Sequence, residues 1–206
     1  TTMVNVLNLE QAFVARIDRN ILGSGMDSET KIGQMQMGIG SNRVIGIVPY
    51  KSTQFQYIGI QNRILHPEEH WEFLTFANTP VNMLPNTESQ LVQNRWVWNR
   101  PITDAVFAGS FFTGRFNPRD HGEIYFYYLH EGETSPTNPT LYTPGFRLYR
   151  DPSRGAFDYE IETIGQTGQK RNNSSSPTLS VGSIMQHLQA GYTFDEPWSP
   201  RLLLQW

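Results

Sequence analysis

Polar and apolar side chains alternate most regularly in the stretch from Phe157 to Thr163. One face carries mainly aromatic and aliphatic groups and the other carries three carboxylates: Phe157, Tyr159, Ile161 and Thr163 against Asp158, Glu160 and Glu162. A period of two indicates an extended strand, because successive Cβ atoms point to opposite faces. Three carboxylates on one face need water or cations. The stretch therefore predicts a strand with one wet face and one apolar face.

The same pattern recurs along the chain and predicts roughly ten or eleven strands. We expect an all-β fold in one domain, residues 1–206, because no amphipathic helix is evident. The long stretch Asn78–Thr103 is irregular and contains three prolines, which break strands. The expected strands are Leu7–Ile17, Ile32–Met37, Arg43–Val48, Phe55–Gln61, Trp71–Ala77, Ala105–Thr113, Glu123–His130, Leu141–Arg150, Phe157–Thr163, Leu179–Phe194 and Arg201–Trp206.

The connections in the second half alternate between longer and shorter segments. They are expected at 131–140, 151–155, 169–177 and 195–200. Up-and-down barrels of the outer membrane have short turns at one end and longer loops at the other. The alternation therefore favours an antiparallel up-and-down transmembrane β-barrel.

Composition narrows the possible functions. Aromatic residues make up 13% of the 206 residues, which suits β-structure, and there is no cysteine for thiolate chemistry or disulfides. The net charge of −3 gives no basic field for nucleic acid. No apolar run is long enough for a transmembrane helix. The N-terminus lacks a signal peptide, so we expect that one was removed or that the chain begins inside a longer protein.

The residues alone leave two folds open. In a soluble β-sandwich that binds carbohydrate, the apolar face of 157–163 would pack inward and its acids would face water. In a membrane barrel the apolar face would meet lipid and the acids would line a wet lumen. Aromatic residues at strand ends, such as Tyr192 and Phe194, suit a membrane interface but also ordinary sheets.

Two groups of residues are candidates for chemistry. The sequence His66-Pro67-Glu68-Glu69-His70 matches H-x-x-E-H, but it lies between two predicted strands, so we expect a charged loop and no metal site. The acids of 157–163 are spaced like a glycosidase pair, which leaves a glycan-cleaving enzyme as a third hypothesis. Without a recognisable sugar cleft, we expect wall charges balanced by arginines, and neither a catalytic step nor a cofactor.

Several segments in collinear order resemble the alginate-export family of outer-membrane porins. The family motif G-R-Q-x-L-x-x-G-S-x-R-L-V is similar to the stretch Gly33–Ile45, and F-D-G-V-R-L is similar to Tyr57–Asn62. Further matches are Phe107-Ala108-Gly109, Ile124–Tyr128, Gly145–Leu148, Phe157–Glu160, Ala190–Phe194 and Pro200-Arg201-Leu202. Two arginines of the family motifs are replaced here by Gln34 and Gln61.

The resemblance implies a monomeric channel in the bacterial outer membrane, in contact with lipid, that passes hydrophilic and anionic solutes such as polyuronate. The loss of two arginines makes the expected pore less electropositive. The family's barrels have more strands than we count, so we expect a truncated chain. We expect Asn78–Thr103 to fold inward as a constriction. The pore-lining and substrate-contact residues would be Arg16, Gln34, Gln36, Arg43, Gln61, Arg147, Asp158, Glu160 and Glu162.

Overall fold

The computed structural model describes residues 9–47, 54–85, 87–93 and 97–206, and within them an antiparallel sheet of 11 strands. Each long strand pairs with the next along the chain, and β5 pairs with β4 outside this order. The strands are β1 (Ala12–Asp18), β2 (Asp27–Met35), β3 (Tyr57–His66), β4 (Trp71–Asn82), β5 (Arg100–Pro101), β6 (Ala105–Arg115), β7 (Asp120–Glu131), β8 (Thr140–Arg150), β9 (Ala156–Lys170), β10 (Leu179–Thr193) and β11 (Arg201–Gln205). The all-β, up-and-down prediction is confirmed.

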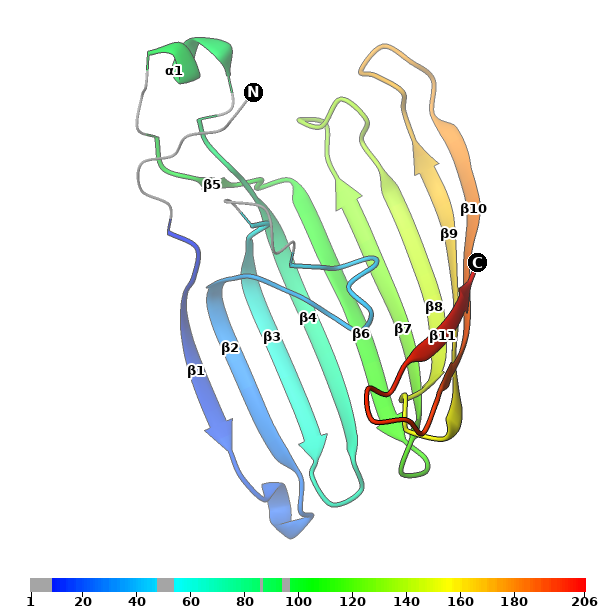
Figure 1. Ribbon diagram of the computed structural model, residues 1–206. Coiled ribbons are helices and arrows are strands. Elements are labelled where there is room, and N and C mark those ends of the chain that lie inside the picture. Colours follow the sequence, from blue (N-terminus) through cyan, green and yellow to red (C-terminus); the bar gives the residue numbers. More distant parts are fainter. Residues whose placement is uncertain (1–8, 48–53, 86, 94–96) are drawn as a thin grey trace.

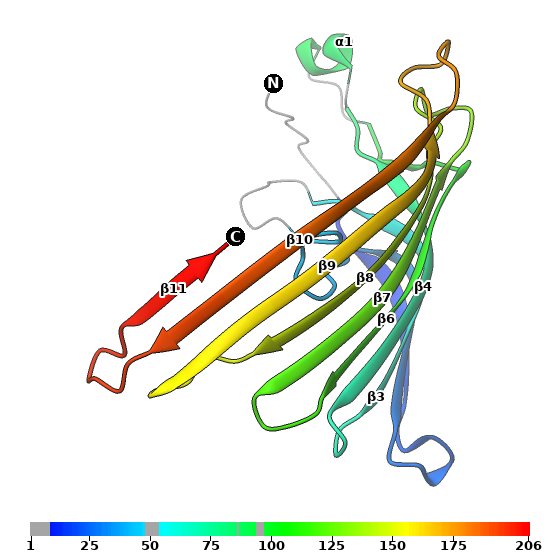
Figure 2. The same ribbon diagram turned by 90° about the vertical axis from the view of Figure 1, so that its right-hand side faces the viewer.

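The sheet is curved and open, because β1 and β11 stand at its two ends and do not pair with each other (Figure 1 and Figure 2). A sandwich needs two stacked sheets, and the described strands form one continuous layer instead. The only helices in the described residues are the five-residue α1 (Glu88–Val92) and the 3₁₀ turn η1 (Ile21–Gly23). Neither is long and apolar enough to cross a membrane.

The connections at one edge of the sheet are four to eight residues long, and those at the other edge are eight residues or longer. One edge carries the segments 19–26, 67–70, 116–119, 151–155 and 194–200, and the other carries 36–56, 83–104, 132–139 and 171–178. Figure 1 shows the first set at the lower edge, called here the short-turn edge, and the second set leaves the strands at the upper edge, called here the long-loop edge. The predicted alternation of long and short connections is therefore present.

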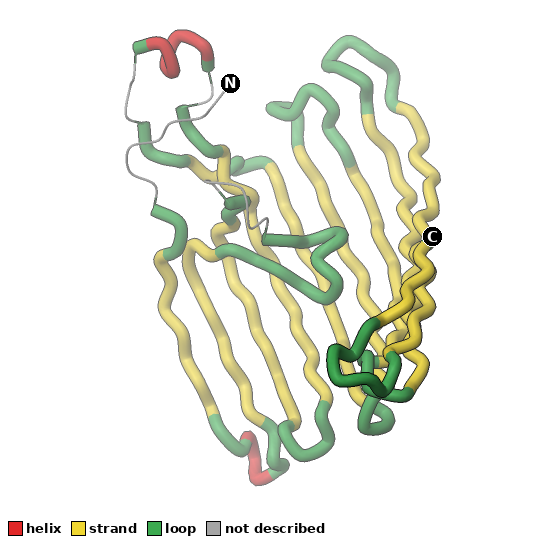
Figure 3. The backbone as a smooth tube through the Cα atoms, viewed as in Figure 1, coloured by secondary structure: helices red, strands yellow, loops and turns green. Residues whose placement is uncertain are grey.

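Residues 36–47 are a loop that crosses the concave face, called here the inner loop (Figure 3). The predicted strand Arg43–Val48 is therefore wrong over its described part. The inner loop closes on itself, since Ile39 N donates to Ile45 O at 3.0 Å. Its buried side chains Met37, Ile39 and Ile45 pack onto aromatic rings of β4, β6 and β7. This apolar anchorage explains why the segment folds inward.

The stretch Asn78–Thr103, expected to be the constriction, takes a different place. Its first five residues extend β4 to Asn82, and α1 and β5 follow at the long-loop edge (Figure 1). The inner loop occupies the position over the concave face instead. Two of its three prolines, Pro80 and Pro101, lie within β4 and β5, so the expectation that they break strands is wrong at these positions.

The two faces of the sheet differ in chemistry. We call the concave face with the inner loop the inner face, and the opposite one the outer face. Strand register places Phe157 and Ile161 on the outer face and Asp158, Glu160 and Glu162 on the inner face. Large apolar side chains are exposed along the outer face on nearly every strand: Val14, Ile32, Ile60, Phe73, Val106, Phe112, Ile124, Phe126, Phe146, Leu148, Ile161, Ile184, Leu188, Leu202 and Leu204.

Candidate functional site

A cluster of charged side chains forms where the inner loop meets β9. The loop turns at Gly40 and Asn42, both in the left-handed region of backbone conformation, with φ of +57° and +60°. A side chain at Gly40 would place its Cβ 3.0 Å from the ring of Phe111 and 3.1 Å from Glu123 Oε2. The close approach and the positive φ together require glycine here. The turn delivers Ser41 and Arg43 to the acidic residues of β9.

Arg43 joins two of the three predicted carboxylates. Its Nη1 lies 2.5 Å from Glu160 Oε1 and also donates to Glu162 Oε2. Burial disfavours the charged guanidinium, but hydrogen bonds to the two carboxylates outweigh it and raise the pKa of Arg43. The inner loop is thus fixed to β9 by charge-assisted hydrogen bonds, which are stronger than neutral ones.

Glu162 is the most enclosed acid of the cluster, with 1% of its surface exposed. Its Oε1 accepts hydrogen bonds from Ser41 Oγ at 2.9 Å and from Tyr125 Oη at 2.8 Å. With Arg43 on its other oxygen, the buried carboxylate is fully engaged. A buried charge is tolerated when it is paired and hydrogen-bonded in this way.

Arg147 extends the cluster across β7, β8 and β9. Its Nε donates to Glu160 Oε1 at 3.0 Å and its Nη1 to Glu123 Oε1 at 3.2 Å. Its guanidinium also lies 4.1 Å from the ring centre of Tyr149. The cluster therefore holds three carboxylates against two guanidinium groups, a net charge of −1 before histidine is counted.

Two polar atoms of the cluster are buried without a hydrogen-bond partner among the described residues. They are Glu123 Oε2 and His187 Nε2, and the latter lies 3.7 Å from Glu160 Oε1. The imidazole of His187 therefore faces the acidic side of the cluster without a hydrogen bond to it. The cluster thus combines fixed ion pairs with two polar groups that a water molecule or a solute could satisfy.

A second ion pair stands apart, near the short-turn edge. Asp158, 2% exposed, accepts hydrogen bonds from Arg201 of β11, with Nε at 3.1 Å from Oδ2. Gly191 of β10 lies between them, and a Cβ there would come within 2.6 Å of Asp158. The pair links β9 to β11 across β10 and is a wall contact of the inner face.

The predicted site residues fall into three groups. The structure brings Arg43, Arg147, Glu160 and Glu162 together, and it places Asp158 and Gln61 elsewhere on the inner face. Arg16 and Gln34 are on the outer face by register, not with the acids as expected. Gln36 follows the end of β2 and donates to Glu10 Oε2. The alternation in β1 predicted that its polar side chains face the lumen. The register instead places Phe13 and Ile17 on the inner face.

Sequence reasoning missed Ser41, Glu123, Tyr125, His187 and Arg201. The alternation of Glu123, Tyr125 and Tyr127 within β7 could have placed them on one face, but the neighbouring aromatics obscured the phase. The contact of Ser41 with Glu162 joins residues 121 positions apart, which no local pattern reports.

The H-x-x-E-H segment lies in a turn between β3 and β4, and not on a helix. His66 Nδ1 accepts a hydrogen bond from the backbone N–H of Glu69 at 3.1 Å. Within the described ranges, no group of three or more acidic or histidine side chains is arranged to hold a metal ion.

Comparison with known families shows to which family the chain belongs. The profile described as alginate export matches residues 2–206. The chain belongs to the alginate export family. No curated protein and no solved structure shows significant similarity to it. Membership of this transport family suggests a role in polysaccharide export for a sheet with one charged and one apolar face.

Proposed function

We propose that this member of the alginate export family forms part of the wall of an outer-membrane channel for hydrophilic solutes, including polysaccharide. One observation carries the proposal: large apolar side chains are exposed on the outer face of nearly every strand, while the inner face holds ion pairs and hydrogen-bonded acids. Ile184, 75% exposed, and Phe157, 71% exposed, illustrate the outer face. In lipid these exposed apolar side chains are favourable, whereas in water extended apolar surface is unfavourable and marks an interaction or membrane surface.

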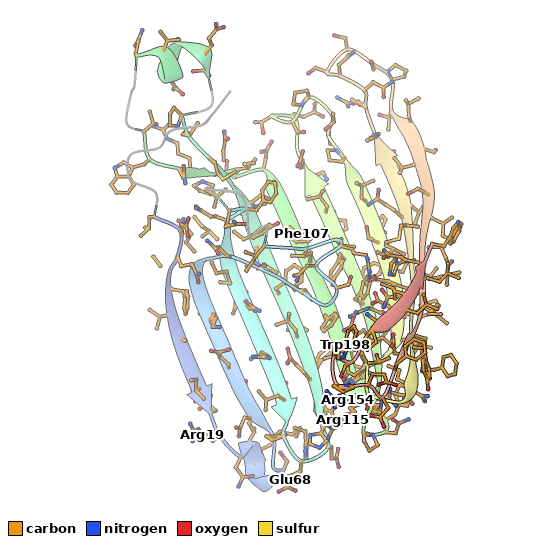
Figure 4. The ribbon with its side chains drawn as sticks, in the orientation of Figure 1. Arg19, Glu68, Phe107, Arg115, Arg154 and Trp198 are labelled. Carbon is orange, nitrogen blue, oxygen red and sulfur yellow. The ribbon has the colours of Figure 1, made fainter. Side chains whose placement is uncertain are left out.

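Aromatic side chains near both edges of the outer face support the same orientation. Tyr128 and Tyr142 pack together near the long-loop edge, with ring centres 5.3 Å apart. Phe157 and Tyr192 do so near the short-turn edge, at 4.7 Å. Figure 4 also shows Trp198 at this edge. Two aromatic girdles separated by aliphatic residues are typical of membrane barrels.

The inner loop would narrow the channel from within. It spans from β2 to β9 and places Arg43 and Ser41 over the carboxylates of the cluster. Solutes would pass beside fixed charges of both signs, which set selectivity in pores. The resemblance implies an anionic solute, whereas the cluster itself has one excess carboxylate. Ion selectivity measured in bilayers tests this anion preference.

No catalytic step is part of this proposal. A glycosidase needs one carboxylic acid that is protonated and a second that is ionised. Glu160 and Glu162 each contact Arg43, and Glu160 also contacts Arg147, so both carboxylates are engaged in ion pairs and neither is placed as a free acid. This arrangement supports wall charges.

Reconstitution of the full-length protein tests the proposal. It should require detergent, show heat-dependent gel mobility and conduct ions in planar bilayers. Replacing Glu160 and Glu162 by Gln should shift ion selectivity toward anions, while the exposed Glu68→Gln at the short-turn edge should not (Figure 4). A folded protein that is soluble as a monomer without detergent would refute the proposal.

A further inference from the structure

Two neighbouring hollows indent the outer face between the middle of the sheet and the short-turn edge. The upper hollow has a volume of about 570 Å³ and the lower hollow one of about 490 Å³. Both are lined by Phe112, Ile124 and Phe146, so they form one continuous depression, called here the outer groove. The groove lies over β4, β6, β7, β8 and β9. Each of these strands has a neighbour on both sides, so the groove does not depend on the open edges of the sheet.

The side chains that separate the two hollows are accessible. Phe112, Ile124 and Phe146 pair across β6, β7 and β8, so they form a row on the outer face. Ile124 is 61% exposed and Phe112 is 38% exposed, and both therefore offer apolar surface to a ligand. The residues beside this row are small and leave the space of the hollows: Ser110, Thr163 and Gly165 in the upper hollow, and Gly114 and Gly122 in the lower.

Neither conformation nor packing requires glycine at two of these positions. Gly114 and Gly165 do not have positive φ, and a Cβ added at either would lie 3.5 Å or more from neighbouring atoms, an ordinary contact. Gly145 on the inner face differs, since a Cβ there would overlap the ring of Tyr125. Glycine inside a strand weakens it and often marks a place that a ligand approaches closely. The space beside Gly114 and Gly165 is therefore available to a ligand.

The outer groove runs along the strands and ends at the short-turn edge. From Ser110 in the upper hollow to Phe116 in the lower one, the chain rises about 20 Å, at roughly 3.4 Å per residue. Half of the hydrocarbon core of a bilayer is about 15 Å thick. In outer-membrane barrels the short turns are periplasmic. The length and direction of the groove therefore match one acyl chain of a phospholipid in the adjacent leaflet.

The lower end of the groove carries one available charge of each sign. Arg115 is exposed at the short-turn edge (Figure 4), and its guanidinium makes no ion pair or side-chain hydrogen bond within the described ranges. Glu69 lines the same hollow, and its Oε2 accepts a hydrogen bond from Trp71 Nε1 at 3.0 Å. Glu123, the third charged residue of the lining, points to the inner face and pairs with Arg147. A zwitterionic headgroup would satisfy both available charges, with its phosphate at Arg115 and its ammonium group at Glu69.

We propose that the outer groove binds one phospholipid molecule, with an acyl chain along the two hollows and a phosphoethanolamine headgroup between Arg115 and Glu69. The site rests on the proposed function, because the groove meets lipid only if the outer face lies in a membrane. This lipid exchanges more slowly than its neighbours, since burial of the chain and two charged contacts act on the same molecule.

Native mass spectrometry of the full-length protein in detergent micelles tests the proposal. The probes are dipalmitoyl lipids with a phosphoethanolamine or a phosphoglycerol headgroup, titrated separately. We expect one saturable adduct with the zwitterionic probe, bound at least fivefold more tightly than the anionic one. Gly165→Leu and Gly114→Leu fill the upper and the lower hollow, and each should weaken the adduct about tenfold, because about two methylene groups of the chain lose their place. Arg115→Gln should weaken it about fivefold through the loss of one charge-assisted hydrogen bond.

Each substitution has a matched control outside the groove. Gly182 is on the outer face of β10 with open space around an added Cβ, so Gly182→Leu should leave the adduct unchanged. Arg19 is an exposed cation at the same edge beside β1 (Figure 4), and Arg19→Gln should also have no effect. Heat-dependent gel mobility verifies that the filled variants fold. If one of them does not, the other and Arg115→Gln decide.

Three outcomes would overturn the lipid site: no saturable adduct, equal or tighter binding of the anionic probe, or unchanged binding in the filled variants. Several weak adducts that respond to Gly182→Leu as much as to Gly165→Leu would show general lipid contact only and would also overturn it. Bilayer conductance of the same preparation separates the two proposals. Conductance without a saturable adduct removes the lipid site alone, whereas a saturable adduct on a protein that does not conduct removes the channel.

Discussion

Replacing Arg43 by Met should release the inner loop from β9. The change removes the guanidinium while keeping a long apolar stem, so Glu160 keeps Arg147, and Glu162 keeps Ser41 and Tyr125. Breaking a buried ion pair costs about 3–5 kcal/mol. Arg43 retains 29% side-chain exposure, so solvent screening reduces the expected loss to about 2 kcal/mol.

Two measurements check this prediction in detergent or lipid: the free energy of unfolding in urea, and hydrogen exchange of the 38–47 amides by mass spectrometry. Exchange should rise in the inner loop and stay unchanged in β9. Arg16→Met is the matched control, because Arg16 forms an exposed pair with Asp18 away from the inner loop, and its loss should leave hydrogen exchange of the 38–47 amides unchanged. Equal effects of the two substitutions would show that the ion pairs do not hold the loop.

Three further predictions concern the turn, the outer face and a surface loop. Gly40→Val should destabilise the protein by about 1–2 kcal/mol in urea unfolding, because the residue has φ of +57°; an unchanged midpoint would contradict the turn geometry. Ile184→Arg should reduce the stability of the lipid-inserted state by about 2–4 kcal/mol, and Ser183→Arg, on the inner face, should not. Hydrogen bonds from Thr134 lower the pKa of Asp104 in the folded protein. The ionised carboxylate therefore stabilises the fold at pH values above the unfolded-state pKa of about 4, and this stabilisation is lost as the pH falls through the lower folded-state pKa. The stability difference between the natural protein and Asp104→Asn should therefore shrink in acid, and a difference that is independent of pH would contradict it.

Strand positions followed from local pattern to within a few residues in the second half of the chain. The expected Leu141–Arg150 is β8, Thr140–Arg150, and the expected Leu179–Phe194 is β10, Leu179–Thr193. These strands are long, and their alternation is set by the requirement that one face be wet and the other apolar. In the first half, Gly33–Ile45 combines glycines with alternating Gln and Met, a pattern that a strand and a loop both satisfy.

The charged cluster was partly predictable for the same reason. The acids of β9 lie on one face because of their spacing. Arg147 lies opposite them on β8, which pairs antiparallel with β9. Arg43 appeared on the polar face of a predicted strand, and it reaches the acids from a loop instead. Arg43 thus pairs with the acids although its predicted local structure was wrong, because opposite charges in a partly enclosed space attract one another in either arrangement.

The sequence by itself determined the period of two, and with it an all-β chain whose strands separate acids from apolar residues. That separation is a local property of the backbone and needs no partner. Only the tertiary structure decided which strand face looks inward at β1 and which of two irregular segments crosses the concave face. It also fixed which cations meet Asp158, Glu160 and Glu162. These outcomes depend on the packing of Met37, Ile39 and Ile45 against distant rings, an interaction between segments that no window of the sequence contains.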